Sequence, residues 1–261
     1  MNIILAALLI LIPSASASQN ACDYAILSKG FVYYDNYNGP SQIDGNVGSS
    51  STTYVFPGSW MPYPSVSKYD AFSESRIVNG RMYSANHKSP TPSNLEKLVV
   101  GMEGLSLNLF NEPVEHSDTS SIAVLEPGKY MWTNGFTISD SRGGTGEITF
   151  DGGGNTAPVW IMEIVGDLTI DIWAKILLVH GAKAENIFWV VHGHIRVNAY
   201  AHVEGIMTSQ KTVTFRSGSS LNGAIYAKQG VNLYSNIEIK TVGLGNVGEC
   251  PTPTPAPTTE T

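Results

Sequence analysis

Charge is scarce in this sequence of 261 residues. Asp, Glu, Lys and Arg make up 14% of the chain, and the formal net charge is −7. A protein that binds nucleic acid needs clustered Lys and Arg to contact the phosphates. An acidic chain with so few charges therefore argues against a nucleic-acid partner.

Long hydrophobic runs are also lacking. The longest, residues 3–12, is shorter than the roughly 20 residues that cross a bilayer, so we expect no membrane span. It precedes the small-residue triplet Ala15-Ser16-Ala17, typical of a cleavage site. We therefore predict a signal peptide at 1–17 and a secreted, extracellular protein. The alternative is that the run forms a buried strand or helix.

Cysteine occurs only twice, at Cys22 and Cys250. In an oxidising compartment these residues could form one disulfide, which would stabilise the domain by about 5 kcal/mol in the chain-entropy picture. The alternative is two free thiols. Residues 249–261 are rich in Pro and Thr and are predicted to form a disordered tail, which leaves 18–248 as one domain.

Glycine and proline are abundant, with 26 and 14 residues, and many segments are rich in β-branched residues. These features predict an all-β protein with frequent turns. One segment, about 67–88, is predicted to be helical. Its small and apolar residues recur every three or four positions, and Pro90 would end it. They are Ala71, Ser75, Val78, Met82 and Ala85.

The C-terminal half contains an internal repeat. The segment from Ala184 matches the segment from Ala157, and later matches recur at a shorter period of about 18 residues, as in Ile195, Val213 and Val231. Three strands and three corners, at about six residues per side, would make one triangular coil of this length. The longer first interval is one coil with a corner insertion near 178–183.

The segments EPGKYMWTNGFTI, ENIFWVV and HVEGIMTS follow one another from Glu126 to Ser209, and QIDGNVGSS begins at Gln42. In this order they closely resemble the microbial ice-binding proteins. The resemblance covers about 25–239. It implies a discontinuous right-handed β-solenoid of triangular coils, with one long α-helix packed alongside. It also implies adsorption to ice, which inhibits ice growth or recrystallisation.

Strand alternation identifies two outward columns of side chains on the strand set that binds ice in relatives, as the resemblance implies. The first column is Thr137, Thr169, Arg196, Thr214 and Asn232. The second column is Ser139, Asp171, Asn198, Arg216 and Tyr234. Small Thr and Asn groups suit a flat ice lattice, whereas charged or bulky residues suit it less well.

The charged residues keep other interpretations open. Asp171 and Arg196 could form a diagonal ion pair on neighbouring coils. The columns could also be ordinary solvated strand residues, since exposed Thr is common on β surfaces. A third interpretation is an extracellular adhesion or carbohydrate-binding solenoid with weak or no ice binding. We expect an ice surface as the main partner, extracellular glycans as the alternative, and a monomer.

Three motifs indicate no chemistry. Residues 243–248 match G-x-G-x-x-G but precede the tail rather than a helix. His192 and His194 lack the further ligands that a metal site needs, so we expect no metal and no cofactor. Asp171 alone supplies too few carboxylates for a polysaccharide-cleaving site. We therefore expect a binding protein and not an enzyme.

Overall fold

The structure is a computed structural model that describes residues 20–35, 39, 41–51, 54–55, 69–118, 123–139 and 146–243. The predicted signal peptide, the tail, Cys250 and residues 244–248 of the glycine motif lie outside these ranges. Cys22 is the one cysteine in these ranges, and it is not a free thiol. Its bridge to Cys250 stays a prediction.

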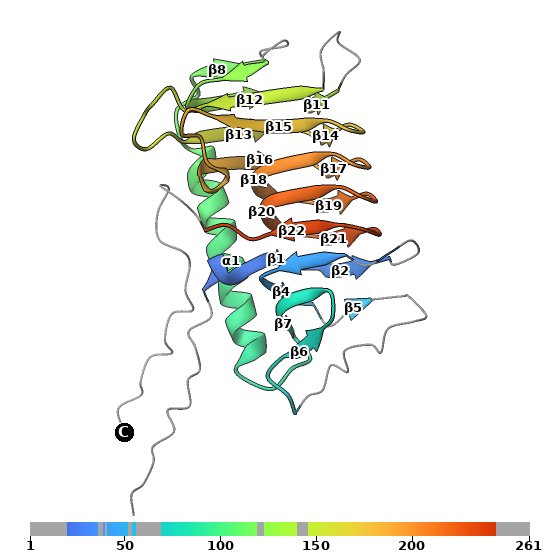
Figure 1. Cartoon of the computed structure of the whole chain (residues 1–261). Helices are drawn as coiled ribbons and strands as arrows, with labels where there is room; N and C mark the ends of the chain where they lie inside the picture. Colours follow the sequence, from blue (N-terminus) through green and yellow to red (C-terminus); the bar gives the residue numbers. More distant parts are fainter. Residues whose placement is uncertain are drawn as a thin grey trace, which may run out of the picture.

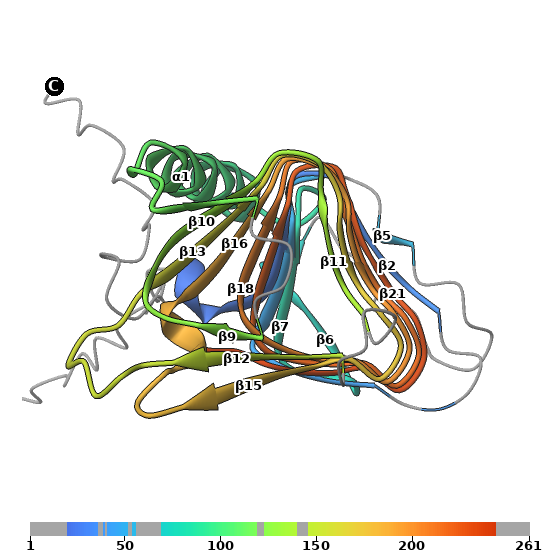
Figure 2. The same cartoon turned by 90° about the horizontal axis from the view of Figure 1, so that it is seen from above.

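The described chain is all-β with one α-helix, and its strands stack in parallel coils (Figure 1). Seen from above, the strands enclose a core on three sides (Figure 2). The first side, called here the threonine side, is one seven-stranded sheet. Its strands are β11 (Phe136–Ile138), β14 (Leu168–Ile170), β17 (Ile195–Val197), β19 (Thr212–Phe215), β21 (Gly230–Leu233), β2 (Phe31–Tyr34) and β5 (Tyr54–Val55).

The other two sides share a fifteen-stranded sheet. The charged side contains β9 (Val124–Leu125), β12 (Glu147–Asp151), β15 (Lys175–Val179), β22 (Glu238–Lys240) and β3 (Gln42–Asp44). The helix side contains β8 (His116–Ser117), β10 (Gly128–Trp132), β13 (Trp160–Ile164), β16 (Ile187–Val191), β1 (Tyr24–Ser28) and β4 (Asn46–Ser49). Three longer strands bend around the corner between them: β18 (His202–Ser209), β20 (Ser220–Ala227) and β7 (Val78–Ser84).

The register confirms the spacing read from the sequence. Ile195 pairs with Val213, and Val213 pairs with Val231, so each step between coils is one repeat period. The earlier pair, Leu168 and Ile195, spans the longer interval. In the chain between Leu168 and Ile195, β15 is followed by a turn and by the short 3₁₀ helix η3 (Ala184–Asn186). The insertion predicted near 178–183 therefore lies at a corner of the coil.

N-terminal strands continue the stack beyond the C-terminal coils, so the coils are discontinuous in sequence. β1 pairs with β20, and β2 pairs with β21, although the partners come from opposite ends of the domain. Inward side chains form one continuous core, in which Phe150 contacts the indoles of Trp160 and Trp189 edge-on. Each large apolar side chain buried in this way stabilises the fold by about 1.5–3 kcal/mol.

The prediction of a helix at about 67–88 is wrong. This segment contains β7 and the short antiparallel strand β6 (Ser73–Ser75). Val78 and Met82 are four residues apart, which is two strand periods, so alternation points both side chains to the same face. Between them β7 bends at Gly80, where a Cβ would lie 2.4 Å from the carbonyl oxygen of Gly45. Both side chains therefore reach the core from two sides of the coil, although the strand has no helical period.

The only helix among the described residues longer than one turn is α1 (Thr91–Phe110), which follows Pro90. Pro90 is the N-cap residue, and Pro92 lies in the first turn, where proline is tolerated. Pro90 therefore marks the start of a helix and not its end. α1 runs along the stack and covers the helix side (Figure 1). Its buried residues are Thr91, Leu95, Leu98, Val99, Met102, Ser106 and Leu109.

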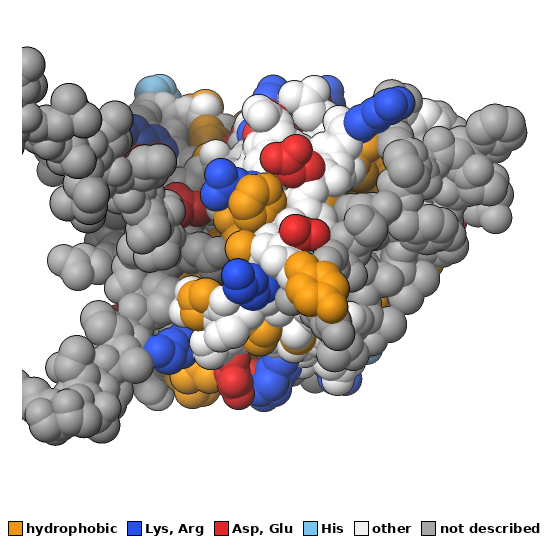
Figure 3. Space-filling model, turned by 90° about the horizontal axis from the view of Figure 1, so that it is seen from below, with side chains coloured by type: hydrophobic (Ala, Val, Ile, Leu, Met, Phe, Trp, Pro, Cys, Tyr) orange, Lys and Arg blue, Asp and Glu red, His pale blue; other side chains and the backbone are white. Residues whose placement is uncertain are grey.

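The β6–β7 hairpin lies at one end of the stack. Figure 3 views the molecule from this end and shows apolar, acidic and basic side chains interspersed over the described surface. His87 holds the hairpin: Ser84 N–H donates to Nδ1 (2.9 Å), so Nε2 carries the proton and donates to Ser73 Oγ (2.9 Å). Burial lowers the pKa of His87 below 6.5, although the negative charge of Asp70 acts in the opposite direction.

A buried ammonium group ends α1. Lys129 Nζ donates to the carbonyl oxygens of Leu109 (3.1 Å), Phe110 (2.7 Å) and Glu112 (2.9 Å), and lies 2.8 Å from Glu163 Oε2. The side chains of Lys129 and Glu163 are only 3% and 10% exposed. The positive charge satisfies the free carbonyls at the helix C-terminus and joins the helix to the core strands β10 and β13.

We predict that Lys129→Met lowers the free energy of unfolding by about 3–5 kcal/mol, because it leaves Glu163 Oε2 and three carbonyls without their donor. Glu163 Oε1 keeps a neighbour, His192 Nε2 at 3.3 Å. Urea unfolding measures the change. Lys228→Met is the matched control: Lys228 is 47% exposed and lies 3.9 Å from Glu103, so we expect a loss below about 1 kcal/mol. Equal losses in the two variants would contradict this role for Lys129.

The lowered pKa of His87 should make the stability of the fold depend on pH. Because its pKa is lowered in the folded protein, the unfolded chain binds the proton first as the pH falls. The contribution of His87 to stability is intact above about pH 6.5 and is lost as the pH falls through the lower, folded pKa. We expect the wild type to lose more stability than His87→Gln between pH 7 and pH 5 in urea titrations. Parallel losses would show that His87 does not titrate in this way.

Candidate functional site

The first predicted column is one continuous register across the threonine side. Thr137 pairs with Thr169, Thr169 with Arg196, Arg196 with Thr214, and Thr214 with Asn232. The flanking residues of each strand lie in the core or against it, so these five side chains point outward. Strand alternation therefore agrees with the register of these five residues, and their role in ice contact stays a prediction.

The second column lies two residues further along each strand, where the chain leaves the sheet. The coils stay aligned there, because each residue's N–H donates to the preceding coil. Asp171 N–H donates to Ile138 O, Asn198 N–H to Ile170 O, and Arg216 N–H to Val197 O, all at 2.8 Å. Ser139 and Tyr234 occupy the same position on the first and last of these coils.

A third outward column was missed. It lies two residues before the first column and contains Asp167, His194, Thr212 and Gly230. The same alternation could have found it, had the strands been extended toward their start. β2 also adds Phe31, Tyr33 and Asp35 to the three columns, which the repeat period could not reveal.

The predicted ion pair between Asp171 and Arg196 is wrong. Arg196 Nη1 lies 2.7 Å from Asp167 Oδ2, whereas Asp171 Oδ1 accepts from the N–H of Ile172 (2.9 Å) and the amide of Asn198 (3.4 Å). Partial burial would raise the pKa of Asp167, but the hydrogen bonds from Arg196 and from His194 N–H outweigh it. The pKa is therefore held below its ordinary value.

Other side chains on the threonine side are also tied to a neighbouring coil. His194 Nδ1 lies 2.6 Å from Thr212 Oγ1, and Asn232 Nδ2 donates to Thr214 Oγ1 (3.5 Å). The Arg216 guanidinium carbon lies 5.5 Å from the ring centre of Tyr234. Both arginine heads therefore contact a neighbouring side chain on the threonine side.

The threonine side can therefore present a flat, fixed grid of small polar and methyl groups. Neighbouring coils in a parallel stack lie about 4.8 Å apart, and alternate residues along a strand about 6.6 Å apart. Thr212 and Thr214 project from one strand, and Thr137 and Thr169 from adjacent coils. Such a grid can order water over an extended area without a deep pocket.

The charged side is a less regular surface. It carries Lys240 with Glu238 at 2.8 Å, and a cluster in which His202 lies 2.8 Å from Ser220 Oγ and 2.9 Å from Glu204 Oε1. Ser, His and Glu in this order suggest a nucleophile with its base. However, Ser220 is the pairing partner of His202 on the next coil, and Asn222 is the partner of Glu204 and donates to its Oε1 (2.9 Å). The cluster is a hydrogen-bonded link between coils.

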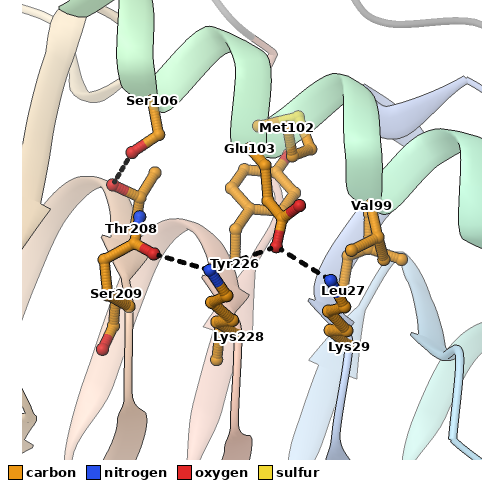
Figure 4. A pocket seen from close by; sticks show the side chains of 12 residues that line it. Leu27, Lys29, Val99, Met102, Glu103, Ser106, Thr208, Ser209, Tyr226 and Lys228 are labelled. Atoms are coloured by element: carbon orange, nitrogen blue, oxygen red, sulfur yellow. Dashed lines mark hydrogen bonds and ion pairs between the residues drawn. The ribbon is translucent and has the colours of Figure 1, made fainter. Parts of the chain in front are cut away.

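A shallow pocket lies between α1 and the helix side (Figure 4). Its floor includes Val99, Met102 and Tyr226, and at its rim Glu103 lies 3.3 Å from Lys29. Lys228 lies 3.9 Å from the same carboxylate of Glu103, so each charge at the rim already has a partner. No cluster of three or more metal-ligating side chains occurs in the described ranges. In the same residues, no helix is long and apolar enough to cross a membrane.

Comparisons with known proteins converge on one family. The profile of the family described as ice-binding-like matches residues 32–238. An ice-binding protein of Colwellia sp is 30% identical over 235 residues, which cover 86% of this chain and 83% of that protein. An ice-binding protein of Leucosporidium sp. (strain AY30) is 28% identical over 224 residues, covering 82% and 78%.

Solved structures agree with the sequence comparison. The crystal structure of a glycosylated ice-binding protein (LeIBP) from an Arctic yeast superposes with a TM-score of 0.73 and 25% sequence identity. The match covers 94% of this chain and 99% of that structure. A second structure of LeIBP, described with its antifreeze activity, gives a TM-score of 0.71 over 92% and 96% of the two chains.

The Arg196–Asp167 pair predicts a small effect on stability. Arg196 is 47% exposed, so we expect Arg196→Ala to change the free energy of unfolding by less than about 1 kcal/mol in urea titration. Raising the salt concentration should weaken the pair further and leave the variant unaffected. A loss of several kcal/mol would show that the pair holds the coils together.

Proposed function

The chain belongs to the ice-binding-like family, and from this premise we propose that it adsorbs to ice crystals through the threonine side and so inhibits their growth or recrystallisation. The observation that carries the proposal is the register of the outward columns. Thr137, Thr169, Thr214 and Asn232 stand in one line on consecutive strands, broken only by Arg196. An extended array suits an extended crystal, whereas a pocket would suit a small molecule.

The proposed activity is moderate. Arg196 and Arg216 interrupt the array, and Phe31 and Tyr33 end it with bulky rings. A guanidinium group holds water in a charged shell, which competes with an ice-like arrangement. The contacts of Arg196 with Asp167 and of Arg216 with Tyr234 limit that disturbance because they fix the heads close to the surface.

The environment of the protein is part of the proposal. Residues 1–17 direct the chain to the extracellular space, Cys22 and Cys250 close a disulfide there, and the protein acts as a monomer. We also propose that the coils form a right-handed triangular solenoid. Support comes from the parallel pairing on three sides, since crossover connections between parallel strands are right-handed in about 98% of cases.

An extracellular adhesion or carbohydrate-binding protein with weak or no ice binding is the second candidate. The charged residues of the second column favour it, since Asp171 and Arg216 resemble glycan-binding groups more than an ice-like lattice. Imaging one ice crystal in purified protein distinguishes the two. Faceting, or a gap between melting and freezing temperatures, is expected for ice adsorption. A round crystal without such a gap would exclude it.

We predict that Thr214→Tyr weakens ice recrystallisation inhibition, because a ring standing above the array prevents close contact around it. The protein concentration that arrests recrystallisation should rise roughly tenfold, equivalent to about 1.4 kcal/mol of adsorption free energy.

Thr149→Tyr is the matched control. Thr149 is a half-buried strand residue like Thr214, but it lies in β12 on the charged side. Its activity should equal that of the wild type. If both variants keep full activity, the threonine side is not the ice-contact surface. If only Thr149→Tyr loses activity, the charged side is the ice-contact surface.

A further inference from the structure

Two stacked aromatic side chains project from the corner between the threonine side and the charged side. Trp173 and Tyr200 occupy the same corner position on neighbouring coils. Their ring centres lie 4.3 Å apart and their planes differ by 11°. Trp173 is 63% exposed and Tyr200 51%, and the adjacent Ile172 is 54% exposed. Burial in the core therefore does not account for these large apolar groups.

The backbone at this corner is unfavourable for both residues. Trp173 and Tyr200 have φ angles of +64° and +61°, and the corresponding residues on the next coils, Gly218 and Asn236, have +75° and +59°. Glycine and asparagine adopt this left-handed conformation most readily. Two residues with large side chains thus stand where the fold itself favours small ones. Backbone strain of this kind is concentrated at functional sites.

The corner repeats its hydrogen bonds on each coil. Trp173 N–H donates to Ala199 O, and Tyr200 N–H to Ser217 O, both at 3.2 Å. A Cβ on Gly218 would lie 2.5 Å from the Tyr200 ring, so that ring lies directly over the glycine. The phenol ring is thus packed between Gly218 and Trp173. Tyr200 covers one face of the Trp173 indole. Trp173 is still 63% exposed, so a ligand can reach it.

Polar groups flank the stack. Asp171 and Asn198 lie two residues before Trp173 and Tyr200, and Asn198 Nδ2 donates to Asp171 Oδ1 (3.4 Å). Lys175 lies two residues after Trp173 and is exposed. The corner thus carries an exposed aromatic pair together with a carboxylate, an amide and an ammonium group within two residues of it along the chain. This combination suits a sugar ring, which has one C–H face and hydroxyl groups around its edge. Opposite charges on the two flanks favour a neutral sugar.

We propose that this corner is a carbohydrate-binding site, in which one neutral hexose residue of an extracellular polysaccharide stacks on the Trp173 indole and hydrogen-bonds to Asp171 and Asn198. Tyr200 packs against the opposite face of the indole, on the side of Gly218. The site shares Asp171 and Asn198 with the second column of the threonine side, but its stacking surface, Trp173, lies outside the outward columns. The proposal therefore does not depend on ice adsorption. It would give the protein a second surface for attachment to a cell wall or matrix.

The test uses the double variant Trp173→Asn with Tyr200→Asn in the whole mature protein. Asn occurs naturally at this corner position as Asn236, so the variant keeps the backbone conformation. We expect its unfolding temperature to equal or exceed that of the wild type. The probes are particles of cellulose, chitin and curdlan, with retention measured by sedimentation. Retention of the wild type on at least one of them should weaken roughly tenfold in the variant.

Tyr69→Asn is the control, because it removes another exposed aromatic ring, 75% exposed, away from the corner. It should be retained like the wild type. The proposal is overturned if no particle retains the wild type, or if the double variant is retained equally well. A lower unfolding temperature with unchanged retention would make the stack a structural element. Loss of ice activity without any polysaccharide retention would assign the corner to the ice surface.

Discussion

Neighbouring coils approach so closely at one corner that no side chain fits between them. Where the charged side meets the helix side, a Cβ on Gly223 would lie 1.9 Å from Gly205 O, and one on Gly80 would lie 2.4 Å from Gly45 O. Each of these glycines has an apolar residue two positions before and after it, as in Leu221 and Ile225, and both reach the core. The close contact fixes where each long strand bends, so it sets the register of two sides at once. On the third side, the parallel pairing of its own strands aligns the outward columns.

The sequence predicts the strand pairing well wherever the paired strands belong to successive coils. The repeat period correctly paired Ile195 with Val213 and Val231, because each strand lies against the next copy of itself. The pairing of β2 with β21 could not be found in this way, since it joins opposite ends of the domain with no shared period. The helix was misplaced for a local reason. Val78 and Met82 lie two strand periods apart, and this spacing of four also occurs along one face of a helix.

The candidate surface shows a similar division. Alternation identified which side chains face outward, because the two faces of a strand differ in burial. It could not identify their partners. Asp167 and Asp171 lie on the coil preceding Arg196, two residues to either side of Thr169, which pairs with Arg196. The choice falls on Asp167 because Asp171 is already held by the N–H of Ile172 and the amide of Asn198. Such a preference depends on side-chain orientation, which no spacing in the sequence records.

The length of helix α1 also constrains the number of coils. Its 20 residues extend about 30 Å, which corresponds to roughly six spacings between parallel coils. Its C-terminus is held at β10 by Lys129, and its N-terminal end follows the hairpin of β6 and β7 at the other end of the stack. Adding or deleting one coil would therefore shift one anchor by about 4.8 Å, or about three helical residues. The array on the threonine side could lengthen only if the helix on the opposite side of the core lengthened with it.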